Sequence, residues 1–229
     1  MINTVIFDMD GVLTDSEPII NAAAIEGLRE FGVKAKPADF LPFVGTGEDG
    51  YIGGVARLYG TEYSPEMKKR VYAIYLGILP GMIKPFPGVL GMIGRLKSMK
   101  ITMAVASSAD RIKVEANLKG IGVTFDTFQV IIAGEDVTSK KPAPDIYLAA
   151  AARMRVSSEN CCVIEDAVNG ITAAKAAGMR CVAVEHSFPA AELRKAGPDC
   201  IRGSFQDISL SDLGLSSQPG SLHQGKAPG

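Results

Sequence analysis

From about residue 89 onward, the chain alternates short apolar runs with longer amphipathic stretches, and this alternation restricts the fold more than any other feature. Each short run has the β-branched and apolar composition of a buried strand, and each longer stretch has the spacing of a helix. Strands joined through helices pair in parallel and need helices on both faces of the sheet. The fold class is therefore predicted to be α/β, with a doubly wound parallel (Rossmann-like) sheet as its core.

The spacing also predicts how the chain is divided. Between residues 16 and 85, helical periodicity recurs and no strand pattern interrupts it, which indicates a smaller all-helical cap inserted after the first strand. Residues 1–15 and 86–215 then form the core, and the polar end at 216–229 is expected to be a disordered tail or a linker. The predicted strands cover 4–7, 102–106, 130–133, 162–164, 180–184 and 200–201, and the predicted core helices cover 89–99, 109–119, 144–154, 168–177 and 190–196.

Composition excludes several classes of protein. The net charge is −1 and no block of one sign occurs, so we expect no nucleic-acid partner. No stretch of about 18 uncharged apolar residues exists, so no direct membrane insertion is expected. The four cysteines fit neither a disulfide framework nor a Cys-x-x-Cys metal site. We expect a monomeric chain in a reducing compartment such as the cytoplasm, and the strand that starts just after Met1 leaves no room for a targeting peptide.

The first strand runs directly into two carboxylates and a glycine, as Asp8-Met9-Asp10-Gly11. Gly11 accepts the turn geometry that ends the strand. In an open parallel sheet, ligands bind beyond the carboxyl ends of the strands, so both acids are predicted to lie at the mouth of a cleft. Taken alone, this pattern is equally typical of a simple turn or cap.

Three further polar sets fall at predicted strand ends: Ser107, Lys141, and the pair Glu165-Asp166. Each has a structural alternative, because Ser107 would cap its helix, Lys141 would be a solvated loop charge, and the acidic pair would be a charged strand exit. Their occurrence together at successive strand ends favours one common site.

Phosphoryl-transfer chemistry needs such a set. Carboxylates without thiol or imidazole suit Mg²⁺, which offsets the repulsion between a phosphoryl group and an attacking aspartate. An aspartate can attack phosphorus, and a second acid can protonate the leaving oxygen and then activate water. A hydroxyl at a helix N-terminus and a lysine bind the phosphoryl oxygens.

With these motifs, the sequence resembles the haloacid dehalogenase superfamily of phosphohydrolases over about residues 1–210, and in particular its β-phosphoglucomutase-like branch. The resemblance implies Asp8 as nucleophile and Asp10 as acid/base. It implies that Ser107 and Lys141 hold the phosphoryl group, and that the helical insertion is a mobile cap that excludes water. For Mg²⁺ it implies a ligand set made up of Asp8, the Asp10 carbonyl and Asp166, with Glu165 assisting.

Within that superfamily, an aspartate at position 10 implies a phosphatase or a phosphomutase. The mutases carry a cap histidine soon after the first motif and basic residues in the cap loop, whereas this chain has Pro18-Ile19-Ile20 and an acidic loop there. The departure favours a Mg²⁺-dependent phosphatase of small, sugar-phosphate-like esters, with a phosphosugar mutase as the alternative. The candidate substrate-binding residues are Gly11, Ser108, Thr46, Gly47, Glu48 and Arg111, although Arg111 fits equally well as a surface helix charge.

Three segments are also similar to the hydrolase domains that stand at the N-terminus of plant thylakoid photoprotection proteins. These segments are 43–48, 53–56 and 105–114. The similarity implies the plastid stroma as a second compartment. It also implies a further alternative, a regulatory or interaction domain of a larger protein with little or no turnover.

Overall fold

A six-stranded parallel sheet forms the centre of the molecule in the computed structural model, which describes residues 1–44 and 46–216. The strands are arranged in the order β3-β2-β1-β4-β5-β6, and every neighbouring pair is parallel. Their bounds are Thr4–Phe7 (β1), Thr102–Ala106 (β2), Val130–Ile132 (β3), Cys161–Glu165 (β4), Arg180–Val184 (β5) and Cys200–Arg202 (β6).

The strand order reverses between β1 and β4. The chain first winds outward from β1 through β2 to β3, then crosses back to β4 and winds outward the other way. Such a reversal leaves a crevice at the carboxyl ends of the two central strands, where no helix covers the sheet edge. In the register, Phe7 pairs with Ile164, so Asp8 follows β1 directly beside Glu165, the last residue of β4.

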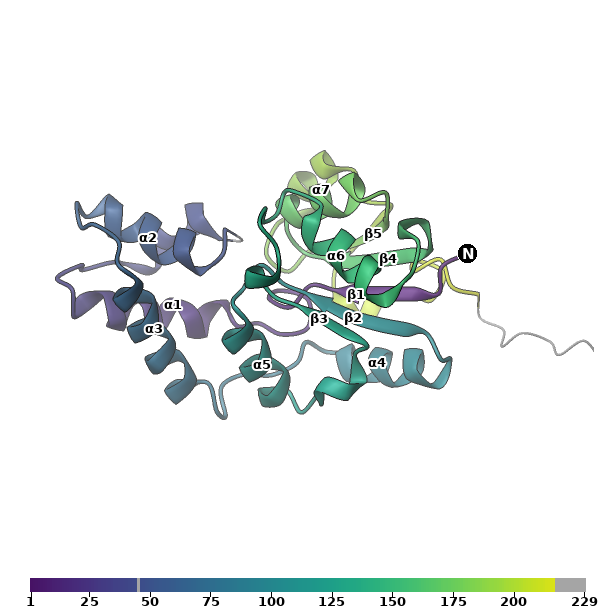
Figure 1. Ribbon diagram of the computed structural model, residues 1–229, viewed down its shortest axis with the longest axis horizontal. Coiled ribbons are helices and arrows are strands. Elements are labelled where there is room, and N and C mark those ends of the chain that lie inside the picture. The colour runs from purple at the N-terminus through teal and green to yellow at the C-terminus, as the bar shows by residue number, and fades with distance from the viewer. Residues whose placement is uncertain (45, 217–229) are drawn as a thin grey trace, which may run out of the picture.

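Helices cover both faces of the sheet (Figure 1). Val5 and Phe7 point to one face and pack with α4 (Val89–Ser98) and α5 (Arg111–Gly120), whereas Ile6 points to the other face and packs with α6 (Asp145–Met154) and α7 (Val168–Ala176). This alternation follows from the two-residue period of a strand. Shorter helices complete the core: α8 (Ala190–Leu193), η2 (Phe125–Thr127), η3 (Gly134–Asp136), η4 (Ser158–Asn160), η5 (Arg194–Ala196) and η6 (Phe205–Asp207).

Residues 16–85, called the cap segment below, contribute α1 (Glu17–Arg29), η1 (Pro37–Phe43), α2 (Glu48–Leu58) and α3 (Pro65–Ile78). These helices lie to the left of the sheet in Figure 1. The α1 and α3 helices pack closely because Gly27 has no side chain, and a Cβ there would lie 2.8 Å from Cγ2 of Val71. The domain boundaries at residues 16 and 85 stay predictions.

The predicted doubly wound parallel sheet is confirmed, and each predicted strand and helix has a counterpart within a few residues. Two helical segments are 3₁₀ helices in whole or in part. Residues 37–43 form a 3₁₀ helix, because Pro42 has no amide hydrogen and cannot continue an α-helical ladder. The helix predicted at 190–196 changes to 3₁₀ after Leu193 and ends at Gly197, which has a positive φ of 71°. Most of the predicted tail, residues 217–229, lies outside the described residues.

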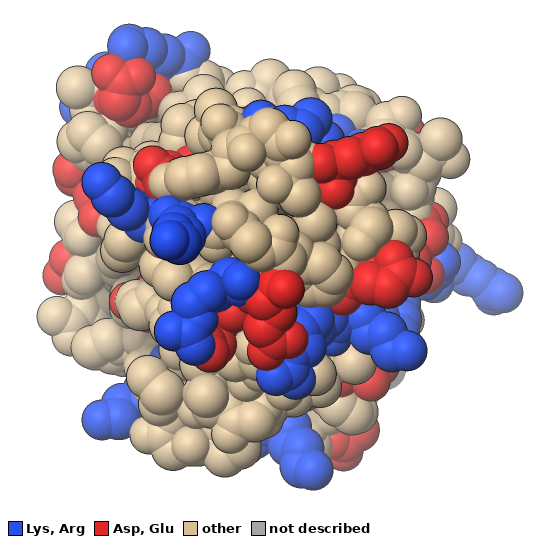
Figure 2. Space-filling model, turned by 90° about the vertical axis from the view of Figure 1, so that its left-hand side faces the viewer, with Lys and Arg blue, Asp and Glu red and all other residues tan. Residues whose placement is uncertain are grey.

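Charges of both signs are interspersed on the end of the molecule formed by the cap segment (Figure 2). No helix among the described residues is long and apolar enough to cross a membrane.

Candidate active site

Three buried carboxylates meet where β1 and β4 end. Asp8, Glu165 and Asp166 each offer an oxygen that lies within 4.8 Å of the other two. Asp8 is 7% exposed and the other two are less exposed still. Gly11 makes room for this cluster: its φ is 80°, and a Cβ at this position would lie 1.8 Å from Oδ2 of Asp166. The predicted glycine turn therefore has a second role, which is to let the Asp166 carboxylate approach the backbone.

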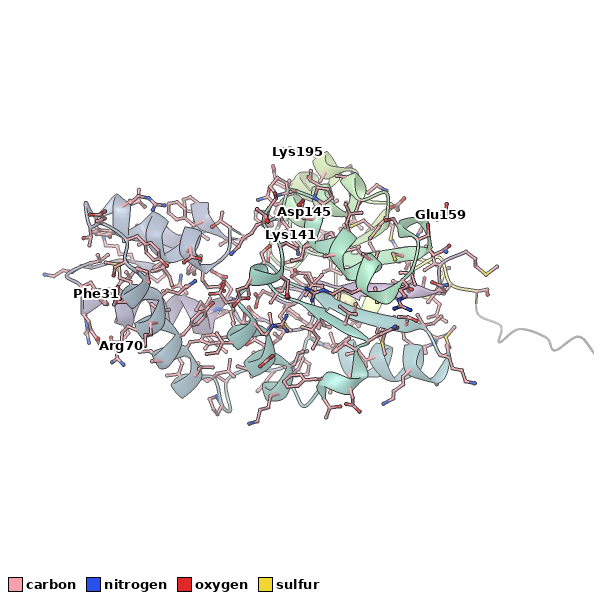
Figure 3. All side chains as sticks on the ribbon, viewed as in Figure 1. Phe31, Arg70, Lys141, Asp145, Glu159 and Lys195 are labelled. Carbon is pink, nitrogen blue, oxygen red and sulfur yellow. The ribbon has the colours of Figure 1, made fainter. Side chains whose placement is uncertain are left out.

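Lys141 supplies a cation to the cluster. Its ammonium contacts Asp8 Oδ1 and lies 2.7 Å from Glu165 Oε1. Figure 3 labels Lys141 beside Asp145 at the start of α6, at the end of the sheet that faces the cap segment, whereas Glu159 lies at the opposite end. The three loops that follow β1, β3 and β4 thus bring the predicted nucleophile, lysine and acidic pair together.

Glu165 has its oxygens occupied by protein donors. Oε1 accepts from Lys141 and from the Tyr147 hydroxyl at 2.7 Å, and Oε2 accepts from the amides of Asp166 at 2.9 Å and Ala167 at 3.1 Å. Gly170 on α7 leaves space for this carboxylate, since a Cβ there would lie 1.6 Å from Oε1. Glu165 is therefore placed to orient Lys141 and the loop that follows β4. Asp166 accepts a hydrogen bond from the Ser187 hydroxyl through Oδ2.

Burial and like charge dominate the electrostatics of the cluster. Burial raises the pKa of Asp8 from its ordinary value of 3.8 to about 7, with Lys141 opposing the rise and Glu165 and Asp10 adding to it. Burial also raises the pKa of Asp166 well above its usual range, and the Glu165 charge adds to this effect. For Lys141, burial lowers the pKa, but the charges of Asp8 and Glu165 outweigh burial and keep the group a cation.

The donor set fits a hard divalent cation such as Mg²⁺. It consists of oxygens alone and it is buried, and its three carboxylates outnumber Lys141, the lysine that contacts them among the described residues. The Asp10 carboxylate does not belong to this cluster. The ligand that the family resemblance implies from Asp10 is its main-chain carbonyl oxygen.

The Asp10 side chain is held by a separate set of donors. The Ser16 hydroxyl and the Asn117 amide at 3.2 Å donate to Oδ1, and the Lys113 ammonium lies 3.0 Å from Oδ2. Lys113 also lies 3.1 Å from Oε1 of Glu48 in the cap segment. The Asp10 carboxylate is thus held by two residues of α5 and by Ser16, which precedes α1. It lies apart from the cluster of Asp8, Glu165 and Asp166.

The two serines after β2 complete the polar wall. Ser107 is 2% exposed, and its hydroxyl accepts from the amide of Ala109 at 3.1 Å. The hydroxyl oxygen of Ser108 is buried and has no hydrogen-bond partner among the described residues. An unpaired buried hydroxyl beside a cleft is a candidate donor or acceptor for a ligand.

These residues line a single cleft of about 550 Å³ between the sheet edge and the cap segment. Of the predicted site residues, the structure brings ten to the cleft wall: Asp8, Asp10, Gly11, Gly47, Glu48, Ser107, Ser108, Lys141, Glu165 and Asp166. Thr46 and Arg111 are not on this wall. The Thr46 hydroxyl donates to the Phe43 carbonyl at 2.7 Å, and the Arg111 guanidinium pairs with Asp136, so the structure does not support a substrate contact for these two.

Sequence reasoning missed Lys113, Tyr147 and Ser187 as site residues. Lys113 and Asn117 are one helical turn apart on α5, among buried apolar residues. Such a polar pair on a buried helix face is a pattern from which a site role could have been predicted. Tyr147 and Ser187 lie on a helix face and in a loop where the local sequence shows nothing unusual. Only the packing of α6 and of the β5–α8 loop brings their hydroxyls to Glu165 and Asp166.

Known proteins are similar to this chain in sequence and in fold. A model of the family described as haloacid dehalogenase-like hydrolase matches residues 2–178. The protein SUPPRESSOR OF QUENCHING 1, chloroplastic, of Arabidopsis thaliana is 44% identical over 216 residues, and the match covers 93% of this chain. The chain spans only 20% of the length of that relative. Phosphorylated carbohydrates phosphatase of Thermotoga maritima is 32% identical over 186 residues, which are 80% of this chain and 86% of that protein.

Among solved structures, a mutant of CbbY from Rhodobacter sphaeroides in complex with xylulose 1,5-bisphosphate superimposes with a TM-score of 0.83. It is 28% identical, and the match covers 93% of this chain and 99% of that chain. The family model spans most of the chain. The chain belongs to the haloacid dehalogenase-like hydrolase family.

Proposed function

We propose that the protein is a Mg²⁺-dependent phosphatase that hydrolyses small phosphate monoesters through a phosphorylated Asp8. One observation carries the proposal: at the switch point of the sheet, Asp8 contacts Lys141 and has an oxygen within 4.8 Å of two further carboxylates, and Asp10 is held two residues away by separate donors. This arrangement separates a nucleophile from a proton carrier, which two-step phosphoryl transfer requires.

In the first step, a carboxylate oxygen of Asp8 forms a bond to phosphorus while the bond from phosphorus to the leaving oxygen breaks. Asp10 gives its proton to that leaving oxygen, so the product departs as a neutral alcohol. Ser16, Lys113 and Asn117 keep the Asp10 carboxyl in place for this transfer.

In the second step, a water molecule attacks the phosphorus of the phosphorylated Asp8. Asp10, now a carboxylate, takes a proton from that water, the bond between Asp8 and phosphorus breaks, and inorganic phosphate leaves. Lys141 and the Ser107 hydroxyl, which line the same wall, bind the phosphoryl oxygens in both steps.

Mg²⁺ bound by Asp8, the Asp10 carbonyl and Asp166 would neutralise charge between the phosphoryl group and the attacking carboxylate. Without a cation, burial keeps part of the Asp8 population protonated near neutral pH, which makes it a poor nucleophile.

The test is phosphate release from a panel of small phosphate esters, with and without Mg²⁺, in the wild type and in Asp8→Asn. Mg²⁺-dependent release that disappears in Asp8→Asn is expected. A wild type that folds and binds Mg²⁺ but releases no phosphate would contradict the proposal. Addition of a sugar bisphosphate and detection of an isomerised product would then identify a mutase. If no reaction occurs, the alternative that fits is a regulatory or interaction domain.

For the compartment, we propose the plastid stroma, supported by the similarity to the Arabidopsis protein whose name gives a chloroplast location. Expression of the complete natural gene product as a fluorescent fusion, with fractionation of the plastids, tests this proposal.

A further inference from the structure

The cap segment presents carboxylates, and no cation, to the cleft. Among the described residues, its contribution to the wall includes Glu17 and Glu48 together with apolar side chains such as Ile20 and Phe43, but no lysine or arginine. Asp15, which directly precedes the cap segment, also lines the cleft. The space that would receive the leaving group of a phosphate ester is therefore bordered by negative charge.

The two lysines on the cleft wall are both neutralised by the protein. Lys141 contacts Asp8 and Glu165, as described above. Lys113 lies between Asp10 Oδ2 at 3.0 Å and Glu48 Oε1 at 3.1 Å, and the side chains of Lys113 and Glu48 are each only 5% exposed. The Lys113 ammonium could bind a second anionic group on a substrate, but it is already paired with the Glu48 carboxylate.

The hydrogen-bonding groups of the cap segment favour donors on the ligand. The Tyr51 hydroxyl donates to Glu17 Oε1 at 2.7 Å and accepts from Asn21 at 3.1 Å, so this hydroxyl is already used within the protein. Glu17 and Asp15 both line the wall, and among the described residues no hydrogen bond uses Glu17 Oε2 or the Asp15 carboxylate. Hydroxyl groups satisfy such acceptors, whereas a carboxylate or a phosphate would face them with like charge.

We infer, on the basis of the proposed function, that the substrate is a monophosphate ester whose leaving group carries hydroxyl groups and no second negative charge. Glu48 determines this specificity because it neutralises Lys113. Rejection of an unwanted ligand through an unpaired or repelled charge is a general route to discrimination. CbbY, whose fold is similar, was solved with a sugar bisphosphate, and the inferred substrate differs from that ligand because it carries only one phosphate.

Two further basic side chains lie near the cleft among the described residues: His186, whose Nδ1 lies 2.7 Å from the Gly11 carbonyl oxygen at the wall, and Lys140. The Lys140 ammonium lies beside Gly47, since a Cβ on that glycine would lie 2.6 Å from it, and its charge acts on Asp49. Its side chain is not part of the cleft wall, so a leaving group does not contact the ammonium directly.

Sorbitol 6-phosphate and 6-phosphogluconate test the inference as a matched pair. They share the carbon chain and the phosphate position and differ only at carbon 1, which carries a hydroxyl in the first and a carboxylate in the second. In the wild type, kcat/KM for sorbitol 6-phosphate is expected to exceed that for 6-phosphogluconate by at least about tenfold. Glu48→Gln removes one of the two carboxylates that pair with Lys113, which makes the cleft less negative, and is expected to shrink this ratio by about tenfold.

The control variant is Glu62→Gln, which removes the same charge from an exposed position of the cap segment and should leave the ratio unchanged. Because the ratio is taken within each variant, a general loss of active protein does not affect it. A wild type that prefers 6-phosphogluconate or does not distinguish the two esters overturns the inference. A ratio that Glu48→Gln leaves unchanged removes Glu48 as its determinant.

Failure of the proposed function gives a different pattern, namely release of phosphate from neither ester. Calorimetric binding of both esters to Asp8→Asn in the presence of Mg²⁺ then decides the inference by itself. Tighter binding of sorbitol 6-phosphate supports it. Equal binding, tighter binding of 6-phosphogluconate, or binding of neither ester overturns it.

Discussion

Asp8 and Asp10 are chemically identical side chains placed in different surroundings. Burial raises the pKa of Asp8 to about 7 and the neighbouring carboxylates add to the rise, whereas the Asp10 carboxylate lies between Ser16, Asn117 and Lys113. Two acids whose environments differ in this way are suited to different roles in one reaction.

Substitution of either aspartate should therefore remove a chemical step. Asp8→Asn and Asp10→Asn are each expected to lower kcat by about 10³ or more, because an amide neither attacks phosphorus nor carries the proton. Steady-state kinetics on the best ester of the panel measures this loss, with circular dichroism as the check on folding. Turnover within about tenfold of the wild type in either variant would disprove the role assigned to that residue.

The raised pKa of Asp8 also predicts how stability depends on pH when no metal is bound. A carboxyl whose pKa is higher in the folded protein stabilises the fold while it is protonated, and this contribution is lost as the pH rises from its ordinary pKa of 3.8 through about 7. Mg²⁺ binds the ionised cluster, so the increase in Tm on adding Mg²⁺ should be larger at about pH 8 than at about pH 5.

Thermal unfolding in EDTA and in excess Mg²⁺ at both pH values measures this effect. Asp8→Asn serves as the matched variant, because it keeps the shape but does not titrate, and its Mg²⁺ effect should depend less on pH. An increase in Tm that is the same at both pH values would contradict the assignment of Asp8 to the metal site.

At the scale of the element, α7 and the loop before it are shaped around one carboxylate. Gly170 lies on the third position of α7, and a Cβ there would lie 1.6 Å from Glu165 Oε1. Since Glu165 also accepts hydrogen bonds from Lys141 and Tyr147, a displaced Glu165 carboxylate disturbs α6 and the loop before it as well.

Gly170→Ala is therefore expected to lower the free energy of unfolding by about 1–3 kcal/mol and to reduce turnover. Gly94→Ala, on the exposed side of α4, is the control: a Cβ there meets nothing within 4 Å, and alanine should stabilise the helix by about 0.5–1 kcal/mol. Urea unfolding of both variants measures the two effects, and equal changes of the same sign would show that the contact with Glu165 has no energetic weight.

At the scale of the whole molecule, a buried hydrogen bond joins the cap segment to the core. The Tyr75 hydroxyl on α3 donates to Asn117 Oδ1 on α5 at 2.5 Å, and the amide of Asn117 in turn donates to Asp10. Tyr75 is fully buried, so its hydroxyl has no water to replace a lost partner. The position of the cap helices is thereby linked to the predicted proton carrier.

Tyr75→Phe should lower the free energy of unfolding by about 1–3 kcal/mol, because it leaves a buried carbonyl oxygen without a donor. It should also lower kcat more than it raises KM, because Asn117 would hold Asp10 less firmly. Tyr59→Phe removes an exposed hydroxyl from α2's end and is expected to change stability by less than about 0.5 kcal/mol. The two variants are compared by chemical denaturation and steady-state kinetics, and an equal, small change in both would show that the link is unimportant.

The sequence alone determined the elements and the core of the candidate site. Strand and helix periods depend on neighbouring residues, so β2 and β5 could be predicted to the residue, and the carboxylates at the ends of β1 and β4 followed from motif and position. The strand order and the partners of each site residue depend on contacts between distant parts of the chain. Such contacts include the pairing of Lys113 with Glu48 and the hydrogen bond from Tyr147 to Glu165. The pairing of Arg111 with Asp136, in place of a substrate contact, is another. Only tertiary packing decides them, because no local pattern records which side chains two separate elements bring within reach of each other.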